Sequence, residues 1–161
     1  MSIYTKFGDD GYSKINHKQL KKNDAVFEVI GDIDELNCQL GLAKARSTKH
    51  EIRKKIENIQ NNIMQLMSEI ALYNKIENFK LIENWKMKIG NLENNIDSHS
   101  TNIPPKFIIP AKSELSALIH IARTICRRAE RHHAKLKYKN KFHSAFLNRL
   151  SDFLFVLAEN C

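Results

Sequence analysis

The sequence is poor in the two residues that most often interrupt regular structure, with five glycines and three prolines in 161 residues. This scarcity argues against a protein built from many short strands and tight turns. Leu, Ile, Lys, Glu and Asn are abundant instead, and together they predict a mostly helical chain. The length suits one domain, residues 1–161, with a single apolar core.

Cysteine is also scarce. Cys38, Cys126 and Cys161 are odd in number and far apart, which argues against a disulfide framework, and no CxxC or Cys/His spacing supports zinc. No apolar run is long enough to cross a membrane. The first twenty residues lack the apolar stretch of a signal peptide. We therefore expect a cytoplasmic protein with no membrane partner.

Acidic residues are the minority among the charged ones. There are 18 of them against 26 Lys and Arg, so the net charge is +8 and the isoelectric point is near 9.4. A basic chain favours anionic partners, which include nucleic acid, anionic lipid and phosphorylated small molecules. Charge alone does not choose among them, because much of the excess is scattered lysine of the kind that covers ordinary surfaces.

Five segments carry apolar residues at helical spacing. They predict helices over about 25–46, 49–73, 77–97, 114–137 and 141–159, after an irregular segment at 1–24. Trp85 lies on an apolar stripe and is expected in the core. The last segment is apolar nearly all round after Asp152, so it should be central or at a subunit interface. His132, His133 and His143 match no metal-ligand spacing and are interpreted as surface or packing residues.

The N-terminal segment from Tyr4 to Ser13 holds two glycines, a Thr, a Lys and a Ser. Glycine lets a backbone approach a ligand closely, and successive N–H groups can form an anion-binding nest. The segment is not a Walker loop. On local grounds it fits an ordinary glycine turn equally well.

The fourth helix carries four arginines and a glutamate within nine residues. At about 100° per residue, one face gathers His120, Arg123, Arg127, Glu130 and Arg131. Arg128 lies about 100° further round. Arginine binds phosphate through a planar fork that stays charged. Because Lys is the usual surface cation of this chain, the cluster indicates a polyphosphate ligand, although a solvated basic face with i,i+4 pairs remains an alternative.

Two carboxylates on other helices extend this hypothesis. Asp34 is expected on or beside the apolar face of the first helix, where a charge needs a partner, and Arg123 is the arginine nearest the apolar stripe. Arg123 is therefore a candidate partner for Asp34. Asn148 and Asp152 are i,i+4 neighbours that face one way in the last helix. Their partner could be a nucleotide or a structural network.

Four motifs occur in the order typical of one family, and the resemblance covers nearly the whole chain. They run over Thr5–Gly11, Gly31–Asn37, Phe107–Arg131 and Asn148–Phe155. The sequence resembles the PduO-type ATP:cob(I)alamin adenosyltransferases. The resemblance implies an all-α, five-helix bundle that forms a homotrimer with active sites between subunits. It also implies transfer of the 5′-deoxyadenosyl group of ATP to cob(I)alamin with Mg²⁺, giving adenosylcobalamin and triphosphate.

The resemblance also assigns roles to residues. It implies that the ATP phosphates are held by N-terminal residues, namely Thr5, Lys6, Phe7, Gly8, Ser13 and Lys22. It implies a nucleotide and magnesium site completed by Arg127, Arg128, Glu130, Arg131 and Asn148, with Glu130 as the metal ligand. Asp34 and Arg123 match an ion pair that shapes the interface and the site. Phe107 matches the aromatic residue that displaces the lower ligand of cobalamin, and Phe155 matches an apolar wall of the corrin pocket.

The chain departs from the family pattern at a few positions. Ala111-Lys112 replaces Gly-Gly, Phe7 replaces a usual Thr, Asp10 a usual Lys and Glu159 a common Arg, and relatives continue beyond Cys161. Most of these changes concern the corrin side, so one alternative is a family member that binds ATP or cobalamin with poor turnover. Another is a basic helical protein that binds nucleic acid. The sequence lacks any recognised nucleic-acid-binding motif, so an enzyme without a nucleic-acid partner is the favoured hypothesis.

Overall fold

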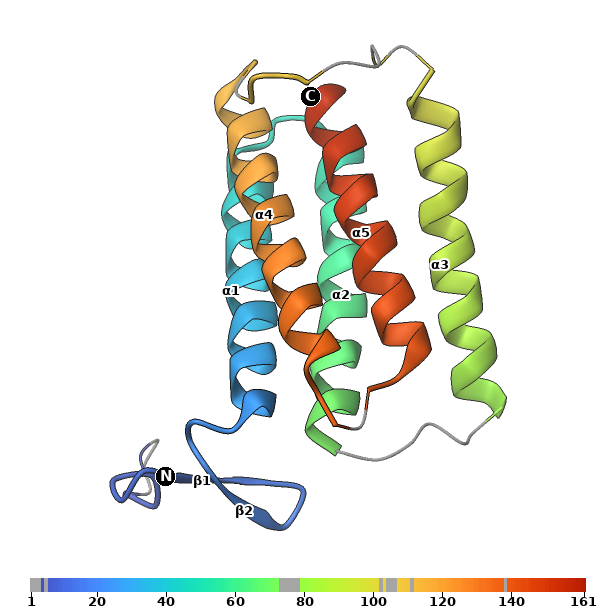
Figure 1. Cartoon of the computed structure of the whole chain (residues 1–161). Helices are drawn as coiled ribbons and strands as arrows, with labels where there is room; N and C mark the ends of the chain where they lie inside the picture. Colours follow the sequence, from blue (N-terminus) through green and yellow to red (C-terminus); the bar gives the residue numbers. More distant parts are fainter. Residues whose placement is uncertain are drawn as a thin grey trace.

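The computed structural model describes residues 4, 6–72, 79–101, 103, 107–110, 112–137 and 139–161. A short antiparallel hairpin, β1 (Tyr12–Ile15) and β2 (Lys18–Lys21), precedes five helices (Figure 1). The helices are α1 (Ala25–Arg46), α2 (His50–Leu72), α3 (Phe79–His99), α4 (Glu114–Ala134) and α5 (Lys141–Glu159). The all-α, five-helix prediction is confirmed. The largest difference in a bound is at the end of α4, which was expected near 137 and falls at Ala134.

The helices run side by side as a bundle. α4 packs between α1 and α5, α2 packs on α1, and α3 lies along the outer side of α5 (Figure 1). The hairpin lies beyond the end of the bundle where α1 begins, whereas the C-terminus is at the other end. This arrangement places α5 between two neighbours, as its apolar sequence predicted.

Side-chain caps fix where three helices begin. The Asp24 carboxylate accepts a hydrogen bond from the backbone N–H of Val26 at 3.0 Å, and the Ser113 hydroxyl accepts one from Ser116 at 3.0 Å. Asn140 does the same for α5. Each cap satisfies a backbone donor that the first helical turn leaves without a partner. The position of the Arg-bearing helix α4 along the bundle therefore follows from a local signal at Ser113.

The largely buried carboxylate of Glu69 joins α2, α3 and α5. Trp85 is fully buried, as expected, and its indole N–H donates to Glu69 at 2.8 Å. His143 lies 2.8 Å from the same Glu69 oxygen, and the ring of His143 packs edge-on against Trp85. Burial is the larger effect on His143 and lowers its pKa against the opposing effect of Glu69. The interpretation of His143 as a packing residue agrees with this network.

The N-terminal segment contains more regular structure than the sequence suggested. Residues 12–21 form the hairpin, in which Tyr12 pairs with Lys21 and Ile15 with Lys18. The two turn residues Asn16 and His17 have φ angles of 44° and 64°. Positive φ at both central positions is what a tight hairpin turn needs. The expectation of an entirely irregular segment at 1–24 was therefore wrong.

None of the helices in the described part of the chain combines the length and the apolar character that a membrane span requires.

Candidate active site

A cavity of about 630 Å³ opens between α4, α5, the end of α3 and the segment that leads into α4. Four of the predicted site residues line it, namely Phe107, Arg123, Arg127 and Phe155. Its other lining residues are Ile96, Ser100, Ile103, Ser151, Asp152 and Val156. The structure therefore brings the predicted corrin-side aromatics and two of the predicted arginines to one place, with one apolar wall and one cationic wall.

The two arginines of this cavity outnumber its one carboxylate, Asp152, which lies 3.9 Å from Arg149. Within the described residues, neither Arg123 nor Arg127 forms an ion pair, and the Nε of Arg123 donates to the Nδ1 of His120 at 3.3 Å. The pKa of Arg123 is lowered, first by burial and then by the positive charge of Arg127. Two adjacent cations that form no ion pair of their own repel each other, and an anionic ligand would offset that repulsion.

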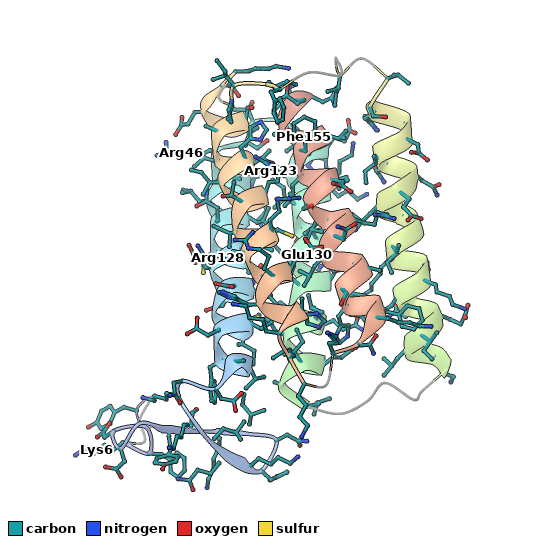
Figure 2. The ribbon with its side chains drawn as sticks, viewed as in Figure 1. Lys6, Arg46, Arg123, Arg128, Glu130 and Phe155 are labelled. Atoms are coloured by element: carbon teal, nitrogen blue, oxygen red, sulfur yellow. The ribbon has the colours of Figure 1, made fainter. Side chains whose placement is uncertain are left out.

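Glu130 lies one helical turn beyond Arg127, on the side of α4 that faces α5 (Figure 2). One of its oxygens, Oε1, accepts a hydrogen bond from the Asn148 amide at 3.0 Å. The side-chain oxygen of Asn148, Oδ1, accepts in turn from the Arg149 guanidinium at 2.7 Å. Two residues that the resemblance grouped in one nucleotide site are therefore in direct contact, although they lie 18 positions apart.

Arg131 is exposed and turns back on its own helix. Its guanidinium donates to the backbone carbonyl of Arg127 at 3.0 Å. The Arg131 side chain therefore contacts the backbone of Arg127, and it is not among the residues that line the cavity.

Arg128 differs from the other arginines in its surroundings. Its Nε donates to Asp32 at 2.9 Å and its guanidinium also contacts Glu35, so it is held against α1 (Figure 2). His132 lies 2.6 Å from the second oxygen of Asp32. These contacts raise the pKa of Arg128, chiefly through the hydrogen bond to Asp32. Within one chain Arg128 joins α1 to α4, so it lies apart from the face of Arg123 and Arg127, as its place about 100° further round the helix predicted. Its role in nucleotide binding stays a prediction.

Asp34 is exposed, whereas Asp32 is the carboxylate that the structure buries. Asp34 flanks the buried stripe of α1 but is exposed, so the inference that its charge needs a partner within the chain was wrong. The structure shows no ion pair between Asp34 and Arg123 within the chain, because Arg123 is directed to His120. Asp34 is left on the surface, where a second copy could reach it.

The N-terminal residues form a separate basic segment. The Lys22 side chain lies against Gly8, where an added Cβ would approach its Nζ to 3.0 Å, so the absence of a side chain at Gly8 permits this contact. Lys6 has a φ of 57°, and Ser13 is half-buried in β1. The Phe7 ring packs under the Lys14 ammonium at 4.4 Å. Thr5 lies outside the described residues.

This basic segment does not meet the cavity within one chain. Lys6 lies beyond one end of the bundle, and Phe155 is near the other end (Figure 2). The predicted nucleotide-binding residues therefore fall into two groups that a single copy keeps apart.

Sequence reasoning missed a network of polar side chains at the C-terminal end of α5. Glu159 is buried, with Oε1 at 3.1 Å from the Nε2 of His120 and Oε2 at 2.5 Å from the Nζ of Lys112. Two residues that depart from the family pattern, Lys112 and Glu159, are thus partners of one another. The reversed charge at position 159 beside a new lysine at 112 was the signal that could have indicated this pair.

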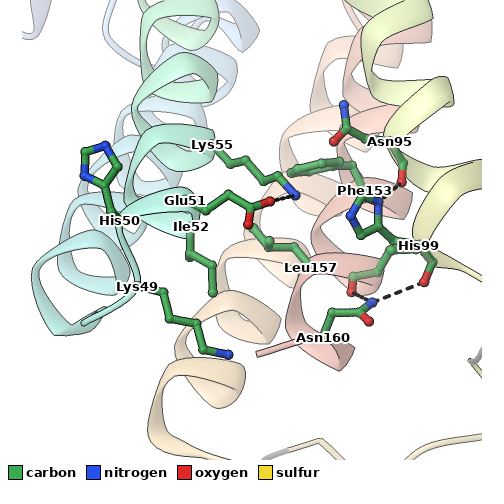
Figure 3. Close-up of a pocket in the computed structure, with 11 residues that line it drawn as sticks. Lys49, His50, Glu51, Ile52, Lys55, Asn95, His99, Phe153, Leu157 and Asn160 are labelled. Atoms are coloured by element: carbon green, nitrogen blue, oxygen red, sulfur yellow. Dashed lines mark hydrogen bonds and ion pairs between the residues drawn. The ribbon is translucent and has the colours of Figure 1, made fainter.

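A second cavity of about 420 Å³ lies on the other side of α5 (Figure 3). Lys49, His50, Glu51, Lys55 and His99 surround it, and the Lys55 ammonium pairs with Glu51 at 2.9 Å. None of the predicted site residues lines it. The first cavity is therefore the candidate active site.

No cluster of three or more His, Cys, Asp or Glu side chains that could hold a metal occurs among the residues that the structure describes. The metal ligand predicted in Sequence analysis, Glu130, is therefore a single carboxylate, and it lies one helical turn from Arg127. A Mg²⁺ ion commonly takes one or two protein carboxylates and fills its remaining positions with phosphate oxygens and water. The arrangement fits a metal that arrives with a nucleotide.

Comparisons with known proteins agree with this geometry. A family profile described as cobalamin adenosyltransferase matches residues 3–161. The corrinoid adenosyltransferase of Bacillus subtilis (strain 168) is 34% identical over 167 residues, which cover 98% of this chain and 85% of the relative. The human corrinoid adenosyltransferase MMAB is also 34% identical, with 97% of this chain and 67% of the relative covered.

Solved structures show the same fold. A variant of a PduO-type adenosyltransferase from Lactobacillus reuteri, complexed with ATP, superposes with a TM-score of 0.87 at 31% identity over 99% of this chain and 93% of that one. Another variant from the same organism, complexed with cobalamin and ATP, gives a TM-score of 0.86 at 32% identity, with 98% and 89% covered. This chain therefore belongs to the cobalamin adenosyltransferase family.

Proposed function

We propose that this protein transfers the 5′-deoxyadenosyl group of ATP to cob(I)alamin. The cobalt, which carries the electron pair, attacks the 5′ carbon of ATP. A cobalt–carbon bond forms as the bond from the 5′ carbon to the triphosphate oxygen breaks, and triphosphate leaves with that electron pair. The nucleophile belongs to the corrinoid, so the protein has to orient the carbon and stabilise the leaving group.

The observation that carries the proposal is one cavity in which two arginines that form no ion pair among the described residues lie beside an apolar wall. Arg123 and Arg127 offer positive charge where triphosphate charge would develop, and Phe107 and Phe155 offer apolar surface. Phe107 is fully exposed at the edge of the cavity. A phenylalanine has no lone pair to donate to a metal, so a corrin face against Phe107 would have no lower ligand from the protein, and four-coordinate Co(II) is the easier form to reduce.

Glu130 is the proposed contact to Mg²⁺. Asn148 orients it through Oε1, and the described residues give its other oxygen no hydrogen bond, which leaves that oxygen available for a cation. The ion, when bound with ATP, supplies neutralisation of the triphosphate charge. The role of the chain is to fix the position of that one carboxylate.

A homotrimer with sites between subunits follows as part of the proposal. The basic N-terminal segment and the cavity lie at opposite ends of one chain, so a neighbouring copy can supply one of the two groups. The exposed Asp34 and the half-exposed Arg123 are available to pair across such an interface. Ile109 and Ile121, which are 90% and 48% exposed, provide apolar surface that a neighbour could cover. Light scattering tests the assembly.

We also propose a cytoplasmic location. The thiols of Cys38, Cys126 and Cys161 are all free, which suits a reducing compartment.

The direct test mixes the protein with ATP, Mg²⁺ and chemically reduced cobalamin under anaerobic conditions and follows the corrin absorption spectrum. Conversion to the adenosylcobalamin spectrum supports the proposal, and no conversion refutes it. Separate titrations with ATP and with cobalamin identify a family member that binds without turnover. Tight, steeply salt-dependent DNA binding without ATP binding would instead favour the nucleic-acid alternative.

Arg127→Ala provides a variant for the same assay. Arg127 is exposed and has no carboxylate partner among the described residues, so its loss should change the free energy of unfolding by less than about 0.5 kcal/mol. Loss of a charged hydrogen bond to triphosphate should weaken ATP use by about 10- to 100-fold. The matched control is Arg53→Ala, an exposed arginine on α2. Full activity of Arg127→Ala, or its failure to fold, would contradict the assigned role.

A further inference from the structure

Glu159 is a charged group buried at the end of α5, with 1% of its side chain exposed. Burial works to raise its pKa, but the hydrogen bonds from Lys112 and His120 outweigh burial, and the net pKa is lowered. The carboxylate is therefore ionised and acts only as a hydrogen-bond acceptor. A buried charge of this kind fixes the groups that surround it, because losing any one of them leaves it uncompensated.

The acceptor at Glu159 determines the state of the His120 ring. The Nε2 of His120, 3.1 Å from Oε1, must donate to the carboxylate. The Nδ1 of the same ring receives the Nε–H of Arg123 at 3.3 Å, and an arginine can only donate, so Nδ1 carries no proton. Glu159 thus selects the one neutral tautomer of His120 that can hold Arg123.

The same ring also contacts the aromatic wall of the cavity. The centroids of the His120 and Phe155 rings are 6.0 Å apart. His120 itself is buried, so its position is set by these neighbours rather than by water. One imidazole therefore orients both a cationic and an apolar residue of the cavity.

Lys112 connects Glu159 to the segment that carries Phe107, the other aromatic residue of the apolar wall. Its ammonium pairs with Oε2 at 2.5 Å and donates to the Glu159 backbone carbonyl at 3.2 Å. Lys112 follows Phe107 by five positions and immediately precedes the cap of α4 at Ser113. Anchoring Lys112 therefore restricts the segment that carries Phe107.

We propose that Glu159 is a positioning residue of the adenosylation site, which holds Arg123 through His120 and anchors the Phe107 segment through Lys112. The inference rests on the proposed function, since the cavity it organises is the one assigned to the corrinoid and the triphosphate. Glu159 does not touch the cavity, so its effect is on the geometry of the two walls. The expected consequence is a slower reaction with the corrinoid and little change in ATP binding. Arg127 and Glu130 keep their places and still hold ATP, whereas a displaced Arg123 offers less positive charge to the departing triphosphate.

The test compares Glu159→Gln with a control, Glu51→Gln, which disrupts the exposed Glu51–Lys55 pair beside the second cavity. Glutamine keeps the shape of the side chain but removes the negative charge. Its amide can turn an N–H toward Nε2 as readily as an oxygen, so it fixes neither the tautomer of His120 nor the pair with Lys112. We expect kcat/KM for cob(I)alamin to fall about tenfold in Glu159→Gln while the Kd for ATP changes less than about twofold. Lys112→Ala should produce part of the same loss, and the double variant should lose less than the two single losses multiplied together.

A spectroscopic measurement separates this inference from the proposed function. In ¹⁵N NMR spectra the wild type should show His120 as the Nε2–H tautomer and a hydrogen-bonded Nε–H for Arg123, and Glu159→Gln should shift both signals. If the wild type forms no adenosylcobalamin, the proposed function fails, and these signals still decide whether Glu159 sets the tautomer. Wild-type kinetics with unchanged signals in Glu159→Gln would overturn the inference. So would an activity loss that matches a fall in Tm while both signals stay unchanged.

Discussion

Replacing Glu69 with alanine should destabilise the bundle more than any change at the candidate active site. The Glu69 carboxylate, 9% exposed, accepts from Trp85 at 2.8 Å and from Gln65 at 2.7 Å, and His143 lies 2.8 Å from it. These contacts join α2, α3 and α5. Trp85 and His143 are buried, so water cannot readily take the place of the carboxylate.

The size of the effect follows from the two buried donors. Each one left without an acceptor costs about 1–3 kcal/mol, whereas the half-buried Gln65 can find water. We therefore expect Glu69→Ala to lower the free energy of unfolding by about 3 kcal/mol. For a chain of this size that corresponds to a fall in Tm of roughly 6–12 °C.

Urea unfolding followed by fluorescence is the assay, since Trp85 is the single tryptophan of the chain and reports directly on its own indole environment. Far-UV circular dichroism follows the helices in parallel. The control is Glu83→Ala, which disrupts an exposed pair with Lys86 and should change stability by less than about 0.5 kcal/mol. A loss below about 1 kcal/mol in Glu69→Ala would refute the reasoning, and adenosylation by the folded variant should stay at the wild-type rate.

Three further predictions concern the metal, the interface and pH. Glu130→Gln should raise the Mg²⁺ concentration needed for half-maximal adenosylation by about tenfold without changing the fold, as a Mg²⁺ titration would show; an unchanged titration would remove Glu130 from the metal site. Asp34→Arg should disperse the trimer in light scattering, and adding Arg123→Asp should restore assembly; a trimer that persists in Asp34→Arg would exclude this pair. The pKa of His133 is lowered to about 4, first by burial and then by the charge of His143. His133 is therefore protonated below about pH 6.5 in the unfolded chain but only below about pH 4 in the folded chain. As a result His133 does not lower the free energy of unfolding above pH 6.5, and lowers it progressively between pH 6.5 and 4. His133→Gln should flatten that decline in unfolding measurements across pH, and an equal decline in both proteins would show that His133 is not its source.

The helices were predictable because local signals define them. Apolar spacing set their bounds to within a few residues, and three of the helices begin at side-chain caps, Asp24, Ser113 and Asn140, which are local features of the sequence. Trp85 could be placed in the core because it lies on an apolar stripe. These signals depend on residues three or four positions apart, so no knowledge of the tertiary structure was needed.

The choice between Asp32 and Asp34 was not predictable in the same way. Each lies about 100° from Ile33, on opposite sides of the buried stripe of α1. Which carboxylate is buried depends on the side where α4 packs, and α4 brings Arg128 and His132 to Asp32. That packing belongs to the tertiary structure, and the periodicity of one helix cannot predict it.

The hairpin and the Glu159 network were missed for related reasons. The strands span four residues each, carry mostly polar side chains, and turn at Asn16 and His17 without a glycine. The Glu159–His120 contact joins residues 39 positions apart, and its chemistry appears only when α4 and α5 lie side by side. The resemblance assigned Arg127 to the nucleotide, Phe107 and Phe155 to the corrin, and Arg123 to an ion pair. That all four line one cavity within a single chain became visible only in the structure.

The most direct test of the account is a product measurement. Wild-type protein is incubated anaerobically with ATP, Mg²⁺ and cob(I)alamin, and adenosylcobalamin and triphosphate are quantified together by chromatography. The account predicts equal molar amounts of the two products, because the bond that breaks joins the 5′ carbon to the triphosphate. Release of phosphate or diphosphate without adenosylcobalamin, or no reaction at all, would contradict it.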